Sequence, residues 1–161
     1  MLLLLFPTHA VVGYLLGVYS RFPVAPLVVG SVLPDLVDRP LFWLGVTPVP
    51  HSVGHSLFVA LSVGVALALA FGPRGVALAL GWLGHILTDM LNVLTTQGPA
   101  VAPYYGLYPL SRPEATESFN TVTVVTPVIE TGHTVHPVVL GLELLVIGWG
   151  ITVVARNWWR D

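Results

Sequence analysis

Long apolar stretches separated by short polar breaks make up most of this chain. No Asp, Glu, Lys or Arg occurs from residue 40 to residue 73. Apolar stretches at 2–20, 55–72, 75–95 and 137–155 approach the length of about 20 residues that a membrane-spanning helix needs. The stretch 24–33 is shorter and precedes Pro34, which favours a re-entrant half-helix with protein around its ends. The pattern therefore predicts an all-α, polytopic integral membrane protein with about four transmembrane helices plus a re-entrant half-helix.

The composition favours the same class of protein. The chain has 161 residues, of which 55% are hydrophobic and 9% are charged, and its mean hydropathy is +0.83. A soluble domain carries about 25% charged residues. We therefore expect one membrane-embedded domain over residues 1–161, located as a multi-pass protein in the inner or plasma membrane. The long polar stretch 96–136 is expected to form a loop that covers the site.

Charge and cysteine content exclude several kinds of function. The net charge is −2 and no basic run occurs, so nucleic acid is not expected as a partner. The absence of cysteine excludes disulfides, thiol nucleophiles and iron–sulfur clusters. The sequence leaves the oligomeric state open.

The polar residues gather in short motifs that offer imidazole and carboxylate ligands. These motifs are Thr8-His9, Pro34-Asp35-x-x-Asp38, His51-x-x-x-His55-Ser56 and Gly84-His85-x-x-x-Asp89. A spacing of three or four residues puts two side chains on one face of a helix. A lone buried histidine is more often a hydrogen-bonded core residue. Counting the helical rise from the span ends, however, places all the motifs in one layer, which favours a common site.

Imidazole and carboxylate together are ligands for a divalent metal. The predicted ligands are His9, Asp35, Asp38, His51, His55, His85 and Asp89. Mixed ligation of this kind favours Zn²⁺, with Mn²⁺ or Fe²⁺ as alternatives, and we expect one or two ions. A bound metal would activate water, and Asp35 or Asp38 would act as the general base.

Some polar residues near these motifs have less certain roles. Ser52 and Ser56 flank histidines, but no Gly-x-Ser-x-Gly elbow is present, so Ser56 is expected to cap a helix or hold an imidazole. His133 and His136 either complete a second metal or cap the last helix. Glu143 either reaches the site or hydrogen-bonds another helix.

Together with Tyr108-Pro109-Leu110, these motifs resemble the inner-membrane metal-dependent hydrolases of the LexA-binding or LexA-regulated type. The resemblance covers most of residues 7–110, and the C-terminal third has no counterpart. Members often have Arg where this chain has Ser52. The order of His and Asp residues is also distantly similar to that of zinc-dependent phospholipase C. The resemblance implies metal-dependent hydrolysis and favours phosphoesters, without naming a substrate.

These observations lead to one expected function and two alternatives. We expect a hydrolase for an ester or phosphoester in a lipid or lipid-linked substrate, because the site is predicted at membrane depth beneath a Tyr-rich loop. The first alternative is a metal or proton transporter that uses the same His and Asp cluster. The second is a structural membrane protein in which the cluster only stabilises the fold.

Overall fold

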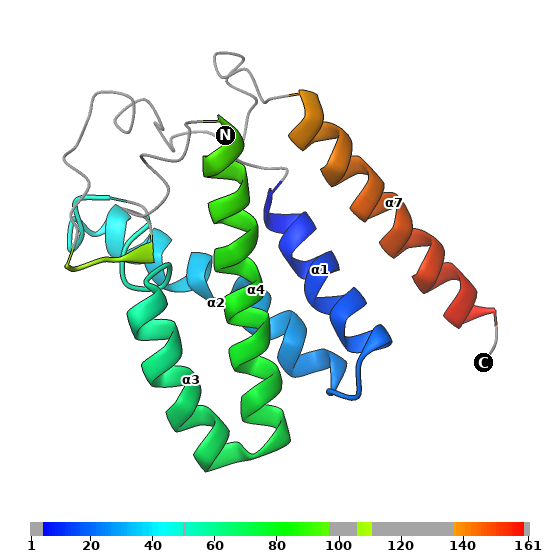
Figure 1. Cartoon of the computed structure of the whole chain (residues 1–161), viewed down its shortest axis with the longest axis horizontal. Coiled ribbons are helices and arrows are strands. Elements are labelled where there is room, and N and C mark those ends of the chain that lie inside the picture. The colour runs from blue at the N-terminus through cyan, green and yellow to red at the C-terminus, as the bar shows by residue number, and fades with distance from the viewer. Residues whose placement is uncertain (1–4, 50, 97–105, 111–136, 160–161) are drawn as a thin grey trace.

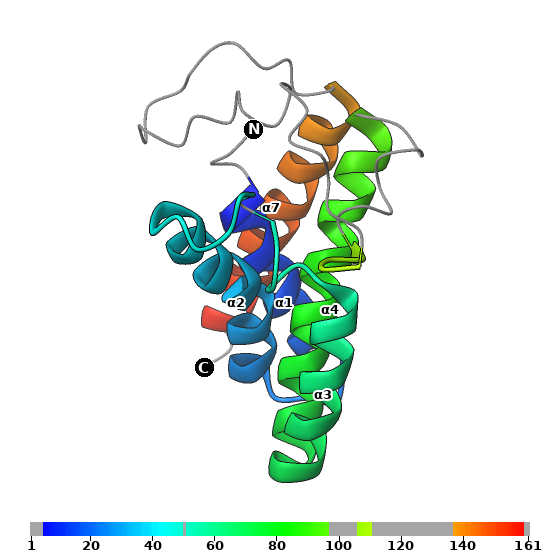
Figure 2. The same ribbon diagram turned by 90° about the vertical axis from the view of Figure 1, so that its left-hand side faces the viewer.

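The computed structural model describes residues 5–49, 51–96, 106–110 and 137–159. These residues form the helices α1 (Leu5–Tyr19), α2 (Val24–Trp43), α3 (Leu57–Phe71), α4 (Pro73–Thr96) and α7 (Pro137–Trp158). Helix α4 packs against α1, α2 and α3, while α7 lies beside α1 at the edge of the bundle (Figures 1 and 2). The prediction of an all-α fold is confirmed for the described residues.

The predicted transmembrane architecture is wrong. None of the described helices combines the length and the apolar character that a membrane crossing requires. Helices α1 and α3 contain 15 residues each. Such a helix is about 22 Å long, whereas the hydrocarbon core of a bilayer is about 30 Å thick. The predicted span 55–72 was too long because it included Ser56 and Gly72, which cap α3 instead of extending it. The multi-pass topology is overturned with the spans.

The predicted re-entrant half-helix is also wrong, because α2 is one helix of 20 residues that continues through Pro34 and Pro40. Proline lacks an N–H and usually breaks a helix interior. Here Pro34 is buried, and a Cβ added at Gly54 would lie 2.6 Å from its carbonyl oxygen. The segment before α3 therefore packs directly on the backbone of α2 near Pro34. As a result, Asp35 and Asp38 lie within a helix and not at its end.

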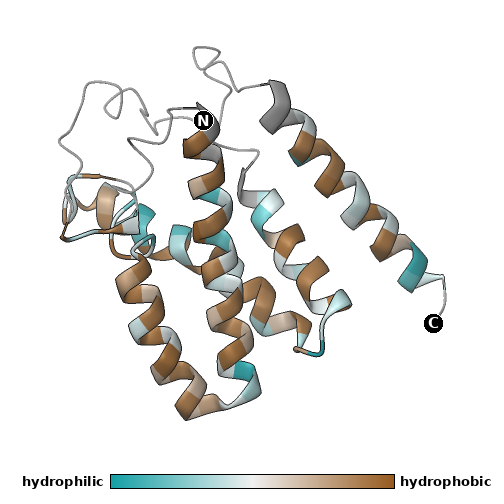
Figure 3. Ribbon diagram, viewed as in Figure 1, coloured by the Kyte–Doolittle hydropathy of each residue, from teal (hydrophilic) through white to brown (hydrophobic). Residues whose placement is uncertain are grey.

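Glycines allow α2 and α4 to pack with their backbones in contact. A Cβ added at Gly30 of α2 would collide with the carbonyl oxygen of Leu78, and one at Gly81 of α4 would collide with that of Leu27. Only residues without a side chain permit such an approach. The buried cluster of Ala60, Trp82 and Ile86 fills the space between α3 and α4. This packing fixes the position of α4, whose polar residues interrupt an otherwise hydrophobic helix (Figure 3).

Only a small part of the expected covering loop can be placed. Within 96–136, the structure describes Thr96 and residues 106–110. The hydroxyl of Ser56 donates a hydrogen bond of 2.6 Å to the carbonyl oxygen of Tyr108, which holds this short piece next to the start of α3. The prediction that the loop covers the site, and the open roles of His133 and His136, lie outside the described residues.

Candidate metal centre

Buried histidine and aspartate side chains gather where α1, α2, α4 and the segment between α2 and α3 meet. The acids and imidazoles of this cluster that are less than a tenth exposed are His9, Asp35, Asp38, His55, His85 and Asp89. The side chain of His51 is 25% exposed and lies beside them, with its ring centroid 4.4 Å from that of His55. The fold therefore brings all the sequence-predicted site residues together from four separate segments.

Helix α4 contributes two of these residues one turn apart. His85 Nε2 and Asp89 Oδ2 are 3.4 Å apart. Helix α1 adds His9, whose Nε2 is 3.1 Å from Asp89 Oδ1 and whose ring stacks on that of His85 at a centroid distance of 3.8 Å. The two oxygens of Asp89 thus face different imidazoles.

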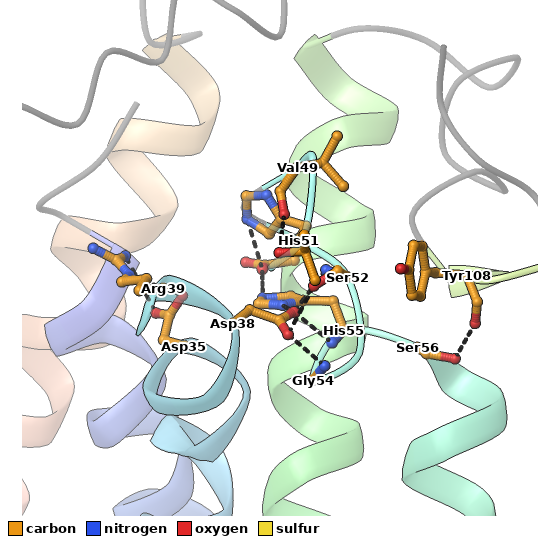
Figure 4. A network of polar contacts seen from close by, with 12 residues as sticks. Asp35, Asp38, Arg39, Val49, His51, Ser52, Gly54, His55, Ser56 and Tyr108 are labelled. Atoms are coloured by element: carbon orange, nitrogen blue, oxygen red, sulfur yellow. Dashed lines mark hydrogen bonds and ion pairs between the residues drawn. The ribbon is translucent and has the colours of Figure 1, made fainter. Parts of the chain in front are cut away.

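Asp38 organises the segment that carries His55 (Figure 4). Its Oδ1 accepts hydrogen bonds from Ser52 Oγ at 3.0 Å and from the N–H of Gly54 at 2.7 Å. Its Oδ2 accepts from the N–H of Ser52 at 2.7 Å and from the N–H of His55 at 3.2 Å, and lies 2.8 Å from His55 Nδ1. Burial raises the pKa of Asp38, but its contacts with His55 and these backbone donors outweigh burial and lower it.

Both oxygens of Asp38 are therefore occupied, and the carboxylate is an acceptor only. This geometry favours a role in positioning His55, and not the role of metal ligand or general base that the sequence predicts. The Asp-x-x-Asp spacing places Asp35 and Asp38 near the site equally well. The pattern cannot show which carboxylate would face a metal and which would bind the backbone of another segment.

The hydrogen bonds fix the tautomers of the two central histidines. His85 Nδ1 lies 2.6 Å from the carbonyl oxygen of Ser31, which can only accept, so this nitrogen carries a proton. His55 Nδ1 donates to the ionised Asp38 for the same reason. In the neutral form, each ring therefore presents an unprotonated Nε2. These two Nε2 atoms face each other at 3.0 Å.

Asp89 completes a triangle of electron-pair donors. Its Oδ2 lies 3.1 Å from His55 Nε2 and 3.4 Å from His85 Nε2. Ligands bound tetrahedrally to Zn²⁺ at about 2.0–2.1 Å are separated by about 3.3 Å. Three such atoms repel one another unless a proton or a metal cation lies between them. The Nδ1 atoms of His55 and His85 donate to Asp38 and to the carbonyl oxygen of Ser31. Hydrogen bonds of this kind orient metal-bound histidines.

Further ligand atoms surround this triangle. Three overlapping groups have ligand atoms within 4.8 Å of one another, namely His9 with His85 and Asp89, Asp35 with His55 and His85, and His51 with His55 and Asp89. Despite its contact with His9, the buried Asp89 Oδ1 has no hydrogen-bond partner among the described residues. Such a buried acceptor needs an explanation, and a metal ligand is one. These buried groups could hold a metal ion.

The charges of the cluster depend strongly on His55. Burial opposes a charge on His55, but hydrogen bonds to Asp38 and Asp89 outweigh it and raise its pKa to about 9. Burial likewise raises the pKa of Asp89, but its close contacts with the imidazoles of His55, His85 and His9 bring it well below its usual value. Burial and the charge of His55 lower the pKa of His51 to about 4, although nearby carboxylates oppose this shift. In the metal-free protein, a proton on His55 therefore supplies the positive charge that a metal ion would otherwise supply.

Asp35 differs from Asp38 because its visible partner is a side chain. Arg39, one turn further along α2, contacts Asp35 through Nε at 3.2 Å and through a terminal nitrogen at 3.4 Å. Asp35 is buried, whereas 32% of the Arg39 side chain is exposed. Arg39 therefore places a partly solvent-exposed positive charge next to the buried Asp35. Arg39 is not among the site residues predicted from the sequence, although its i,i+4 spacing from Asp35 is a recognisable signal.

Helix α7 adds one more buried acid near the cluster. Glu143 is 6% exposed, and its Oε2 has no hydrogen-bond partner among the described residues. Burial raises its pKa, the nearby His9 lowers it and Asp89 raises it further, so that the net shift is upward. The sequence left open whether Glu143 reaches the site or hydrogen-bonds another helix. These interactions favour a position near the site.

The serines beside the histidines are engaged elsewhere. Ser56 is the N-cap of α3, where its oxygen accepts from the N–H of Val59 at 3.3 Å, and its hydroxyl donates to Tyr108. The hydroxyl of Ser52 donates to Asp38. The prediction that Ser56 caps a helix is confirmed. Neither contact pattern is that of a serine nucleophile paired with a histidine.

Comparison of the chain with protein-family models, with curated proteins and with solved structures found no match. The resemblance to inner-membrane hydrolases is thus carried by the short motifs alone. The function has to be inferred from the chemistry of the cluster.

Proposed function

We propose that the protein is a metal-dependent hydrolase of ester or phosphoester bonds. The main support is the triangle formed by His55 Nε2, His85 Nε2 and Asp89 Oδ2, with edges of 3.0–3.4 Å and both rings held by their Nδ1 atoms. Preformed, buried and oriented ligands are typical of a metal centre. The resemblance of the sequence motifs to metal-dependent hydrolases supports the same class.

The residues suited to hold the metal are His9, His51, His55, His85 and Asp89. Their nitrogen and oxygen atoms favour Zn²⁺, with Mn²⁺ and Fe²⁺ as alternatives. The two oxygens of Asp89 face different histidines, so this carboxylate could serve one ion or bridge two. When bound, such a metal would lower the pKa of water to about 7 and stabilise charge on the reacting oxygen.

Asp35 is the best candidate for the general base. One of its oxygens lies within 4.8 Å of ligand atoms of His55 and His85, and no backbone donor in the described part of the chain binds Asp35 as several bind Asp38. A carboxylate in this position could hold the attacking water and accept its proton. Arg39 keeps Asp35 oriented, and its partly exposed guanidinium could contact an anionic phosphoryl oxygen.

The proposed substrate is a lipid or a lipid-linked ester. This expectation was first based on membrane depth, and that basis was lost with the transmembrane topology. An apolar groove between α1 and α7, whose lining on α1 begins at the residue after His9, supports it independently.

The strongest alternative is a structural network without metal. It is favoured by the pKa of His55, raised to about 9, because a proton shared with Asp38 and Asp89 would also hold the cluster together. The transporter alternative is less well supported. A translocation relay needs polar groups along a path, whereas the buried acids and imidazoles of the described residues gather around one cluster.

Metal content decides between the enzyme and the structural network. We would measure it by mass spectrometry in purified wild type, His85→Ala, Asp89→Ala and the control Thr88→Ala, which alters the same turn of α4. Thr88 donates to the carbonyl oxygen of Gly84 and, within the described part of the chain, makes no hydrogen bond to the triangle. We expect one or two equivalents of metal, by the ligand count above, in wild type and Thr88→Ala only. A folded wild type that takes up no stoichiometric metal, even after metal is added, would disprove the proposal.

Activity then tests the reaction class. Metal-loaded wild type should hydrolyse a nitrophenyl carboxylic ester or a nitrophenyl phosphodiester, and chelation should abolish the reaction. Asp35→Asn should retain metal but lose turnover if Asp35 is the base. Retention of full turnover in that variant would assign the base to another group.

A further inference from the structure

An apolar groove lies between α1 and α7, with one wall completed by Val28 of α2. Its volume is about 620 Å³. Ligand pockets usually have about 300–1,000 Å³. Its lining includes Val11 and Tyr14 of α1 and Val154 of α7, and none of the described residues that line it is charged. The groove is therefore large enough for a small ligand and suited to an apolar one.

Both helices that form the groove also reach the candidate metal centre. On α1, the groove begins at Ala10, the residue after His9. On α7, Glu143 interacts electrostatically with His9 and Asp89, and Gly150 lines the groove about two turns further along. In Figure 1, the two helices run side by side from their amino ends. The groove thus leads away from the cluster toward the C-terminal end of α7.

The far end of the groove is lined by Trp158 and Trp159. From Gly150 to Trp159, the lining extends about 13 Å along α7 at the rise of an α-helix. Near the other end, a Cβ added at Gly150 would lie 2.5 Å from Val11 Cγ1, so the helices are in close contact there. The lining is therefore elongated along α7 and ends at aromatic rings, while on α1 it begins at the residue after His9.

The chemistry of the lining selects the kind of ligand. A polar group entering this groove would lose hydrogen bonds to water and would find almost no replacement. A hydrocarbon chain, by contrast, gains about fourfold in affinity for each methylene that becomes fully buried. A chain attached to an ester or phosphate head would allow the head to reach the cluster at the same time.

We propose that this groove binds a single hydrocarbon chain of the substrate, with the polar head at the metal centre and the chain end beside Trp158 and Trp159. The position of the head rests on the proposed hydrolase function. Binding of the chain does not, because it requires only the groove. The two ideas can therefore fail separately.

Bromine quenches tryptophan fluorescence at short range, which makes brominated fatty acids suitable probes. ω-Bromohexadecanoic acid, kept below its micellar concentration, should quench the fluorescence of the full-length protein in a saturable manner. α-Bromohexadecanoic acid has its bromine at the head and should quench less. Replacing both Trp158 and Trp159 by Phe should remove the extra quenching by the ω-bromo acid. The other tryptophans remain as an internal reference.

A pair of variants on α7 tests the location. Val154→Phe narrows the groove, whereas Leu145→Phe makes a similar change at a residue that is 70% exposed and does not line the groove. We expect Val154→Phe to weaken binding at least tenfold, as loss of about two buried methylenes would, and Leu145→Phe to leave it unchanged. Unbrominated acids from octanoic to hexadecanoic should compete with increasing strength.

Three results would overturn the proposal. They are absence of saturable quenching, equal quenching by the two brominated acids, and equal effects of Val154→Phe and Leu145→Phe. If Val154→Phe instead dissociates an oligomer in light scattering and no fatty acid binds, the groove belongs to a contact with a second copy. Normal fatty-acid binding by a protein that takes up no metal would disprove the hydrolase and leave the chain site in place.

Discussion

His55 and His85 face each other through their Nε2 atoms at 3.0 Å, while the Nδ1 of each ring donates to a fixed acceptor. If either imidazole ring flipped, or if its proton moved from Nδ1 to Nε2, Asp38 or the carbonyl oxygen of Ser31 would lose its donor. The two Nε2 atoms therefore have to share a cation, either a proton or a metal ion. This relationship makes the cluster sensitive to both pH and metal.

Metal binding should release a proton at neutral pH. The pKa of His55 is raised to about 9 in the metal-free protein, so the metal has to displace this proton. We expect release of about one proton at pH 7 and an apparent affinity that rises about tenfold per pH unit up to about pH 9. Titration calorimetry in buffers with different ionisation enthalpies measures the proton directly. Binding without proton release would mean that His55 is not a ligand.

The metal-free protein should lose stability as the pH rises from 6.5 to 9. His55 has a raised pKa, so its protonation stabilises the folded state fully below the unfolded value of 6.5 and no longer does so above about 9. The loss over this window is about 3 kcal/mol, at about 1.4 kcal/mol per pKa unit. Urea unfolding at several pH values measures it. The metal-loaded protein should show no such decline, because the metal ion then supplies the positive charge between the two Nε2 atoms in place of the proton.

Asp38 and Asp35 should respond differently to the same substitution. Asp38→Asn removes the negative charge that faces His55 and replaces one of the two acceptor oxygens, which together serve His55 and the backbone of Ser52 and Gly54, by an NH2 donor. We expect about 3–5 kcal/mol of lost stability, as for one partner of a buried ion pair. Its metal affinity should fall by about 10–100-fold, since an outer partner is lost.

Asp35→Asn is the matched control for Asp38→Asn. It faces Arg39, which is partly exposed, so its effect on unfolding should be below about 1 kcal/mol. Equal destabilisation by the two variants would contradict the different roles that their contacts indicate. Chemical unfolding and metal titration of both variants provide the comparison.

The sequence predicted the helices well because their signal is local. The apolar stretches correspond to α1, α3, α4 and α7, and motif spacing placed His85 and Asp89 on one face of α4. The span 55–72 was misjudged, because it included Ser56 and Gly72, which cap α3, although a cap at Ser56 was itself expected from the sequence. The break expected at Pro34 did not occur, because packing against the segment near Gly54 supports a continuous α2.

The candidate site was predictable in membership but not in arrangement. Residue type and spacing pointed to the histidines and aspartates that the fold brings together. The task of Asp38 depends on contacts across 14 to 17 residues of sequence, which no local pattern contains. The approach of Glu143 depends on how α7 packs beside α1, and the motifs contain no information about that packing.

Ser56 provides a test of the metal mechanism against a serine mechanism. Ser56→Ala removes the N-cap of α3 and should cost about 1 kcal/mol of stability. It also removes the hydrogen bond to Tyr108. Hydrolysis by the metal-loaded protein should persist within about threefold, because an effect on fold stability this small leaves the protein folded. Loss of more than about a hundredfold in kcat, with metal still bound, would indicate a nucleophilic serine.

Glu143→Gln should stabilise the protein at neutral pH. Burial raises the pKa of Glu143, so its protonated form stabilises the fold below the unfolded value of 4.5, and this contribution is lost as the pH rises through the higher folded pKa. Above that pH the carboxylate is ionised, and no described residue donates a hydrogen bond to Oε2. The penalty is about 1–3 kcal/mol, and a neutral amide largely avoids it. Thermal unfolding at acidic and at neutral pH should therefore show a gain at neutral pH only. If Glu143→Gln instead lowers the metal content of a folded protein, Glu143 is a ligand, and α7 completes the metal centre.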